Sequence, residues 1–398
     1  MATAVNADSP TGRGGNVQMT FAHSGAHDQR FASVARQFES YAAADPGFSA
    51  QLSIRMHGDL MLEMAVGPYL SIDSVTGVYS VTKGVAGLVI ATLIDQGLLE
   101  LDHPVSTYWP EFAQNGKETV TVRQLLSHQA GLPLAARPLR LEELTDRSAA
   151  EVLAAQRPLW HPGTAFGYHA LTIGVLMEEL VRRLTGRTLQ EVYETSIRAP
   201  LDADFFLGLP EAEEGRYIDM RDVELTDDQA EELATRPPLD SLAASVFANT
   251  DAPDDRSPSG VSSNNEVIRR SGPAAIGGVG SAHGLALLYA ATLPGAPHPI
   301  ASPDAFAVMA QQQSWGMDRV LNVMNCFGVV FMLPQPRLPF GGLGAYGHDG
   351  AGGALAFADP TTGLSFGYIP VPMQYPGGAD HRSLELARLA AEATRGAS

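Results

Sequence analysis

The sequence predicts an α+β fold: an antiparallel sheet built from both chain ends, flanked by the terminal helices, with an all-helical lobe inserted between the two halves. Strand-like alternation occurs near both ends, over residues 51–66 and 353–371, whereas the segments between them have mainly helical periodicity. The composition, 45% apolar and 18% charged over 398 residues, is that of a folded protein large enough for two lobes.

The N-terminal part predicts a helix followed by a hairpin. Residues 31–43 have the spacing of an amphipathic helix, and residues 51–56 and 61–66 alternate as two strands joined across 57–59. Residues 1–25 are small and polar, which predicts a flexible N-terminus. They lack the apolar core of a signal peptide, and we therefore expect a cytoplasmic protein. Cys326 is the only cysteine, so no internal disulfide is expected.

The middle of the chain predicts helices. The first starts at Tyr79 and ends at Gly97, with Val85, Leu88, Val89, Leu93 and Ile94 expected on one face. Further helices are predicted over residues 122–127, 171–184 and 189–197. Residues 211–280 are rich in Asp, Glu, Pro, Ser and Asn, which predicts a long surface excursion.

The C-terminal part predicts three strands, over residues 320–332, 353–358 and 364–371, and a closing helix over 383–394. We therefore expect residues 26–95 and 315–398 to form one discontinuous α/β lobe. Residues 96–314 would form the mainly helical lobe.

Charge narrows the range of partners. The 26 basic and 44 acidic residues give a net charge of −18, which would repel a phosphate backbone or an anionic lipid surface. No stretch approaches the roughly 18 apolar residues of a membrane span. We expect a small-molecule partner and neither nucleic acid nor membrane. The oligomeric state is left open.

The strongest local signal is Ser80-Val81-Thr82-Lys83 at the start of the first long helix. Positions i and i+3 share a helix face, so the Ser80 hydroxyl and the Lys83 amine lie within reach of each other. A serine needs a base to become nucleophilic, and an amine among apolar residues loses its charge readily. Only two of the 26 basic residues, Lys83 and Lys117, are lysines, which makes a lysine at this position informative.

Two further elements follow in order. Tyr168 lies in a turn that leads into a helix, and Gly347-His348-Asp349-Gly350-Ala351-Gly352-Gly353 lies near the C-terminal strands. Together with Ser80 and Lys83, this ordered set resembles the serine β-lactamase and penicillin-binding-protein superfamily, which uses Ser-x-x-Lys, a Tyr-x-Asn element and Lys-Thr-Gly. The resemblance runs from about residue 52 to the end, and it is strongest to the family VIII carboxylesterases with their class C β-lactamase-like fold.

The resemblance implies a serine hydrolase that cleaves carboxylic esters through an acyl-enzyme on Ser80. Lys83 and Tyr168 would share the roles of general base and acid, and the residues alone do not say which does which. The backbone N–H groups of Ser80 and Ala351 would form the oxyanion hole. Ala170 replaces the Asn of β-lactamases, and His348-Asp349 replaces Lys-Thr. An aspartate there disfavours a substrate carboxylate, so β-lactamase activity is a minor alternative.

The expected substrate site comprises His348, Asp349 and Gly350 together with an apolar acyl pocket. The pocket residues are Trp160, Phe166, Trp315 and Phe327. No cofactor is expected, and the 11 histidines form no motif of the kind that binds a metal. An acyltransferase, which passes the acyl group to an amine or alcohol, is the main alternative, and a catalytically silent binding protein is a further one.

A rival hydrolase motif fails on its context. Gly363-Leu364-Ser365-Phe366-Gly367 matches the G-x-S-x-G elbow of α/β-hydrolases, which requires a helix after the serine. Pro370 and Pro372 follow instead, and they exclude that helix.

Overall fold

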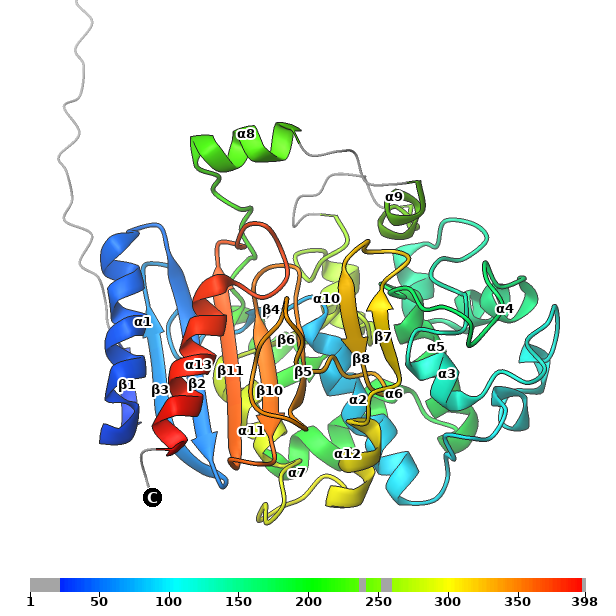
Figure 1. The fold of residues 1–398 in the computed structure, drawn as a ribbon, viewed down its shortest axis with the longest axis horizontal. Helices are drawn as coiled ribbons and strands as arrows, with labels where there is room; N and C mark the ends of the chain where they lie inside the picture. Colours follow the sequence, from blue (N-terminus) through cyan, green and yellow to red (C-terminus); the bar gives the residue numbers. More distant parts are fainter. Residues whose placement is uncertain (1–21, 236–240, 252–259, 396–398) are drawn as a thin grey trace, which may run out of the picture.

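The computed structural model describes residues 22–235, 241–251 and 260–395. Its main sheet has six antiparallel strands in the order β1-β3-β2-β11-β10-β9 (Figure 1). The strands are β1 (Ala22–His27), β2 (Ser49–Met56), β3 (Asp59–Val66), β9 (Tyr346–Asp349), β10 (Leu355–Asp359) and β11 (Leu364–Val371). The central pair, β2 and β11, comes from opposite ends of the chain, and Ile54 pairs with Phe366. The prediction of an antiparallel sheet built from both chain ends is confirmed.

The predicted hairpin is present between β2 and β3. Met56 pairs with Asp59, so the loop consists of His57 and Gly58. Both loop residues have positive φ, 52° and 89°, which is the conformation that suits the right-handed twist of the two strands. Residues 22–25, which we expected in a flexible terminus, belong to β1 and pair with β3, while residues 1–21 lie outside the described part.

Helices cover both faces of this sheet. The terminal helices α1 (Ala32–Ala44) and α13 (His381–Arg395) pack together and against the sheet on one side (Figure 1). Residues three and four apart on α1, Val34, Ala35, Phe38 and Ala42, supply its buried face. Helix α11 (Ala282–Ala290) packs against β2, β10 and β11. The sheet therefore has an apolar layer on each side.

The helical lobe packs against α2 (Val81–Asp95), which begins directly after Ser80. The helices of the lobe, with α12 beside α2, are α3 (Val122–Leu126), α4 (Arg147–Ala155), α5 (Thr172–Thr185), α6 (Leu189–Tyr193), α7 (Ala199–Leu201), α10 (Glu266–Ser271) and α12 (Pro303–Met309). Short 3-10 turns occur at Gln29–Phe31, Val105–Thr107, Pro110–Phe112, Leu141–Thr145 and Glu211–Arg216, and a π turn at Glu194–Arg198.

One expectation about α2 was wrong. We predicted a single apolar face, but every residue from Val81 to Leu93 is buried. The helix lies between the sheet and the helical lobe and contacts β9, α5, α6 and α12. A helix enclosed on all sides requires apolar or small residues all round, and the sequence supplies them. Lys83 is the one ionisable residue in this segment.

Two small sheets were not predicted. One has the order β4-β6-β5, from β4 (Thr76–Gly77), β5 (Phe205–Leu207) and β6 (Gly278–Gly280). The other is a hairpin of β7 (Ser314–Met317) and β8 (Met324–Phe327). The strand predicted over 320–332 is therefore limited to β8, because Asn322 and Val330 adopt left-handed conformations that interrupt an extended strand.

The segment 211–280 is only partly a surface excursion. Its first part includes α8 (Asp227–Thr235) and α9 (Ser241–Phe247), and α8 has no buried residue. Its last part enters the core, where Ala274, Ala275 and Val279 are at most 2% exposed. Composition misled the prediction because the polar residues are concentrated upstream of this buried end.

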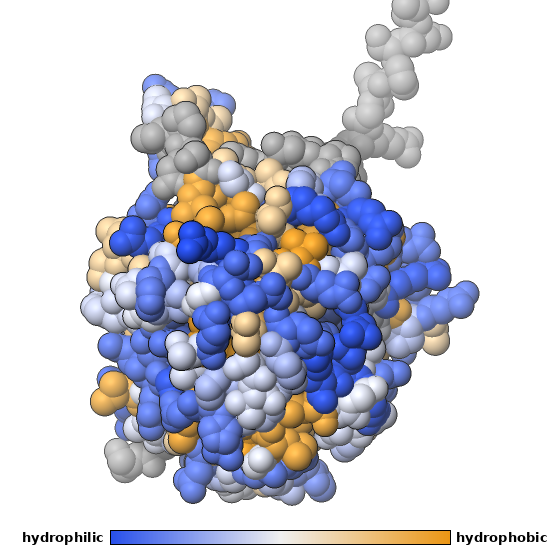
Figure 2. All heavy atoms as spheres, turned by 90° about the vertical axis from the view of Figure 1, so that its right-hand side faces the viewer, coloured by the Kyte–Doolittle hydropathy of each residue, from blue (hydrophilic) through white to orange (hydrophobic). Residues whose placement is uncertain are grey.

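The face of the helical lobe is mainly hydrophilic. Figure 2 shows hydrophobic side chains there as separate patches within a hydrophilic surface. In the part of the chain with assigned positions, no helix combines the length and the apolar character needed to cross a bilayer.

Candidate active site

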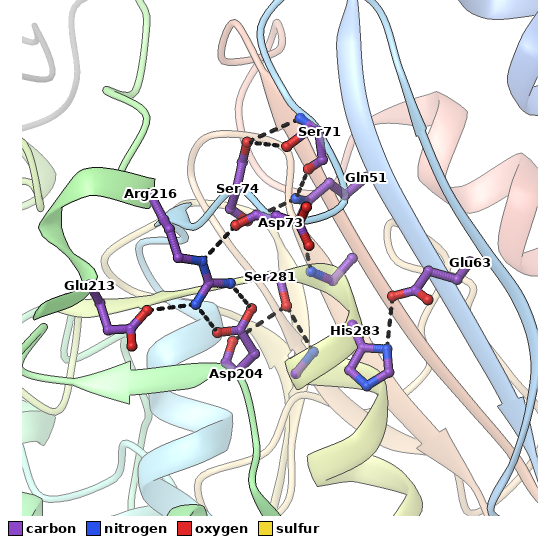
Figure 3. A network of polar contacts seen from close by, with 12 residues as sticks. Gln51, Glu63, Ser71, Asp73, Ser74, Asp204, Glu213, Arg216, Ser281 and His283 are labelled. Atoms are coloured by element: carbon purple, nitrogen blue, oxygen red, sulfur yellow. Dashed lines mark hydrogen bonds and ion pairs between the residues drawn. The ribbon is translucent and has the colours of Figure 1, made fainter. Parts of the chain in front are cut away.

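The loop before α2 is anchored from two sides (Figure 3). On the sheet side, the buried Gln51 side chain of β2 donates hydrogen bonds to the carbonyls of Ser71 (2.6 Å) and Ser74 (2.8 Å). On the other side, Arg216 donates to the carbonyl of Asp73 at 2.8 Å. These contacts hold the loop that leads through β4 to the start of α2.

Ser80 lies at the N-terminal end of α2. Tyr79, immediately before it, has a φ of 47°, a left-handed conformation that is costly for a tyrosine. Ser80 itself is half-buried, and its carbonyl accepts the hydrogen bond from the Lys83 N–H at 2.9 Å. The turn at Tyr79 therefore brings the chain to Ser80, which is the N-cap of α2 and whose side chain makes no capping hydrogen bond.

Lys83 contacts Ser80 across one helical turn. Its Nζ lies 3.0 Å from the Ser80 Oγ and 2.9 Å from the carbonyl oxygen of Ala275. The side chain has no exposed surface. Burial lowers the pKa of the Lys83 amine to about 7, although the nearby charge of Asp349 opposes this shift. Close to neutral pH, a large fraction of Lys83 is therefore able to accept a proton.

Tyr168 completes this group from the helical lobe. Its ring centroid lies 4.9 Å from the Lys83 Nζ, and the nearby Ser80 side chain partly opposes the rise in the pKa of its phenol. The Tyr168 ring stacks on Phe327, with centroids 6.1 Å apart and planes 14° from parallel. Burial raises the pKa of the Tyr168 phenol well above its ordinary value of 10. The phenol therefore stays protonated at neutral pH.

The third sequence element lies on β9, beside α2. His348 is fully buried, and burial together with the charge of Lys83 lowers its pKa to about 4. Its Nδ1 lies 2.7 Å from the carbonyl oxygen of Asp349. A carbonyl oxygen only accepts, so Nδ1 carries the ring proton and donates a hydrogen bond to this oxygen. The Asp349 carboxylate accepts hydrogen bonds from Arg337 (3.3 Å) and the N–H of Ala379 (3.1 Å). The Asp349 carboxylate is thus occupied by protein partners, whereas His348 is paired through Nδ1 and its buried Nε2 has no hydrogen-bond partner within the described part of the chain.

Gly350 and Ala351 bring this element to the loop before Ser80. A Cβ on Gly350 would lie 2.3 Å from the carbonyl oxygen of Val78, so only glycine allows this approach. Ala351, the next residue, is exposed. Within the part of the chain that the structure describes, neither the Ser80 nor the Ala351 N–H donates a hydrogen bond to another backbone group.

The four predicted acyl-pocket residues do not all lie together. Phe166 packs against Phe327 with centroids 6.1 Å apart, and Trp160 is partly exposed. Trp315 pairs with Cys326 in the β7–β8 hairpin, and Ser314 pairs with Phe327. Because neighbouring residues of a strand point to opposite faces, Trp315 lies on the face away from Phe327 and Tyr168. The structure therefore separates Trp315 from the proposed pocket.

A largely buried polar chain, which the sequence did not predict, links Tyr168 to β9. The N–H of Tyr168 donates to Asp318 Oδ1 at 3.0 Å, and Asn325 Nδ2 donates to Asp318 Oδ2 at 3.1 Å. Arg337 then bridges the Asn325 Oδ1 (3.1 Å) and the Asp349 carboxylate. Asp318, Asn325 and Arg337 belong to no local motif, so nothing in the sequence pattern marked them.

A cavity of about 780 Å³ lies elsewhere, between α12, β8 and β9, and its walls include Phe306, Cys326, Leu333 and Tyr346. None of the predicted acyl-pocket residues lines it. Among residues 22–235, 241–251 and 260–395, no cluster of His, Cys, Asp and Glu side chains is arranged to hold a metal ion.

Comparisons with known proteins agree with this fold. The beta-lactamase family model matches residues 38–385. The chain is 31% identical over 366 residues to esterase/beta-lactamase LipL of Mycobacterium tuberculosis, covering 87% of this chain and 82% of LipL. The solved structure of EstA from Arthrobacter nitroguajacolicus Rue61a is 42% identical, with a TM-score of 0.84 over 95% of this chain and 100% of that one.

A second solved structure, described as a family VIII carboxylesterase, is 29% identical. Its TM-score is 0.79 over 94% of this chain and 100% of that chain. The resemblance noted from Ser80, Lys83, Tyr168 and the β9 element is confirmed at the level of family and fold. With the family model matching most of its length, the chain belongs to the beta-lactamase family of serine hydrolases and has esterases among its relatives.

Proposed function

We propose that the protein hydrolyses carboxylic esters through an acyl-enzyme on Ser80. The observation that carries this proposal is the contact of the Ser80 Oγ with the buried amine of Lys83 at 3.0 Å, beside the phenol of Tyr168. Both a base and an acid are then available to one nucleophile. LipL and the carboxylesterase structure, both described as esterases, support esters as the substrate class.

Lys83 is proposed as the base of the acylation step. The Ser80 Oγ attacks the ester carbonyl carbon while its proton passes to the Lys83 Nζ, which requires a neutral amine. The lowered pKa of Lys83, about 7, supports this role. The Ala275 carbonyl, at 2.9 Å, accepts a hydrogen bond from the same nitrogen and so fixes its orientation. The N–H groups of Ser80 and Ala351 would stabilise the oxyanion.

Tyr168 is proposed as the acid. Its raised pKa keeps the phenol protonated, so it can donate its proton to the departing alkoxide and regain one from the Lys83 ammonium. The products of this step are the free alcohol and an acyl group esterified to Ser80. In deacylation, water attacks the acyl carbon with the same groups acting in reverse, and it releases the carboxylic acid and free Ser80.

Esters are favoured over β-lactams because the β9 element offers no free cation for a substrate carboxylate. Burial lowers the pKa of His348 to about 4, so its ring is neutral at pH 7, and Arg337 is already paired with Asp349. Ala170 also lacks the amide of an asparagine. We therefore infer that β-lactam hydrolysis is at most a side activity.

Intact-mass measurement after brief exposure to a fluorophosphonate tests the nucleophile. One phosphonyl adduct is expected on the wild type and none on Ser80→Ala. An adduct formed on Ser80→Ala at the wild-type rate would overturn the assignment. Product analysis with an activated ester and a panel of alcohols and amines tests the reaction type: free acid alone supports hydrolysis, whereas dominant transfer products would establish the acyltransferase alternative.

A further inference from the structure

The Lys83 amine is held by a backbone carbonyl from a distant part of the chain. Its Nζ donates to the carbonyl oxygen of Ala275, 192 residues further along, at 2.9 Å. Ala274 and Ala275 are both buried, at 0% and 2% exposed. Because Lys83 has one contact to Ser80 and one to Ala275, the place of that carbonyl helps to set the direction of the amine.

Glu178 of α5 fixes the segment that carries this carbonyl. Its Oε1 accepts hydrogen bonds from the N–H of Ala274 at 2.9 Å and from Gln190 Nε2 at 3.0 Å. The same Gln190 nitrogen donates to the carbonyl of Gly272 at 3.1 Å. Glu178 and Gln190 therefore bind both ends of the three-residue segment that immediately precedes Ala275.

The packing of α5 leaves this segment little freedom. Gly174 lies four residues before Glu178, on the same helix face. A Cβ on Gly174 would lie 2.7 Å from the N atom of Ala275, so the helix and the segment are in close contact. A shift of the Ala274 N–H toward or away from Glu178 would therefore move the Ala275 carbonyl as well.

A carboxyl group at this buried position requires an explanation, because an apolar side chain would pack there without a desolvation cost. Glu178 is 9% exposed, and burial raises its pKa to about 8. It is therefore mainly protonated at pH 7 and acts as a neutral hydrogen-bond acceptor through Oε1. The charged residues beside it, Asp146, Arg147, Glu179 and Arg182, line the same small hollow.

We propose that Glu178 is a positioning residue for Lys83: it holds the Ala274–Ala275 segment so that the Ala275 carbonyl keeps the Lys83 amine beside Ser80. The proposal rests on the proposed function, in which Lys83 activates Ser80. It adds a residue that contacts neither the substrate nor the reacting atoms. It also makes the reactivity of Ser80 depend on α5 in the helical lobe.

The test separates reactivity from folding by titration with a fluorophosphonate. The endpoint gives the fraction of molecules with a competent site, and the second-order rate constant gives the reactivity of each such site. The variants are Glu178→Leu, which removes the acceptor, and Glu178→Gln, which keeps a carbonyl oxygen at the same place. Glu179→Gln is the matched control, because Glu179 is 4% exposed and pairs with Arg182 and Arg183.

For Glu178→Leu we expect a rate constant about 10- to 100-fold below wild type with a retained endpoint, since small displacements of a catalytic group have effects of this size. Glu178→Gln should recover the rate to within about threefold, because the carbonyl acceptor remains. Glu179→Gln should lower only the endpoint or the melting temperature. A reduced endpoint with an unchanged rate constant for Glu178→Leu would overturn the proposal.

Two further variants keep the test decisive. If Glu178→Leu does not fold, Gln190→Met replaces it, since it removes the donor to both Glu178 and Gly272, and an unchanged rate constant there overturns the proposal. Lys83→Ala distinguishes failure of the proposed function from failure of the positioning role of Glu178. If Lys83→Ala reacts at the wild-type rate, the proposed function is wrong. If Lys83→Ala is inert and Glu178→Leu reacts normally, only the positioning role fails.

Discussion

The Nζ of Lys83 lies 3.0 Å from the Oγ of Ser80, and the lysine has no exposed surface. An amine in this environment is poorly solvated, which favours its neutral form and lowers its pKa to about 7. Ser80 and Lys83 are in contact because they lie one helical turn apart at the start of α2. Lys83 is buried because α2 packs between the sheet and the helical lobe. The pH dependence of the enzyme should therefore report on Lys83.

We expect kcat/KM for an activated ester to rise with pH and to level off above a midpoint near 7. Below this pH the Lys83 amine is protonated and unable to accept the Ser80 proton. Chromatographic quantification of the released carboxylic acid measures this without interference from the ionisation of the leaving group. In Asp349→Asn, which removes the charge that raises the pKa of Lys83, the midpoint should move to lower pH. A midpoint above pH 9 in the wild type would contradict the role of Lys83.

Lys83→Met should stabilise the protein at pH 7 while abolishing activity. Between pH 7 and 10.5 the unfolded chain binds a proton at Lys83 that the folded protein releases, so wild-type stability falls as pH decreases through this window. Methionine removes this cost, and we expect a gain of about 1–3 kcal/mol in the free energy of unfolding. Urea unfolding of both proteins at pH 7 and pH 10 measures this gain, which should be smaller at pH 10. An equal or larger gain at pH 10 would contradict a lowered pKa of Lys83 as its cause.

Tyr168→Phe should lower kcat by about 10²- to 10⁴-fold, because the leaving alkoxide loses its proton donor. The ring stack on Phe327 is retained, so the melting temperature should change little. Esters with better leaving groups need less protonation, and the deficit should shrink along a series of phenyl esters with decreasing phenol pKa. A deficit that is the same for all leaving groups would exclude Tyr168 as the acid.

Phe327→Ala and Trp315→Ala should differ sharply, although the two residues lie on paired strands. Phe327 is fully buried against Tyr168 and Phe166, and its removal should cost about 3–5 kcal/mol of stability and reduce kcat/KM. Trp315 is 46% exposed on the other face of the hairpin. We expect Trp315→Ala to change kcat/KM for short-chain esters by less than about twofold. Equal losses of kcat/KM in both variants would contradict the placement of Phe327 and Trp315 on opposite faces of the hairpin.

Asp318→Ala should be strongly destabilising. The buried Asp318 carboxylate accepts hydrogen bonds from the N–H groups of Tyr168, Val320 and Leu321 and from the Asn325 amide. Its loss leaves several buried donors without a partner, and we expect about 3–5 kcal/mol less stability by urea unfolding. Asp318→Asn, which keeps one acceptor oxygen, should lose less. Equal effects of the two substitutions would mean that the hydrogen bonds do not matter.

Local patterns in the sequence were enough for the fold class and for most elements of the sheet. Alternation marked β2, β3, β10 and β11, and the positions of α1 and α13 followed from helical spacing. The strand predicted over 320–332 was too long. Two residues in this segment, Asn322 and Val330, have left-handed backbone conformations, and the pattern of hydrophobic residues does not reveal them. Strand β1 and the buried end of the 211–280 segment were missed for a similar reason, since polar or small residues there pair or pack with distant elements.

The sequence by itself determined which groups are available for chemistry: Ser80 and Lys83 one helical turn apart, the turn that carries Tyr168, and the glycines around His348. Their catalytic roles stay predictions. Only the tertiary structure decided which groups surround them, namely the Ala275 carbonyl on Lys83, the Asp318 carboxylate behind Tyr168 and the exclusion of Trp315 from the face of Phe327. The physical reason is the separation of the contacting residues along the sequence. Backbone geometry fixes relations between residues a few positions apart, whereas contacts between segments 150 or 192 residues apart depend on how whole elements pack.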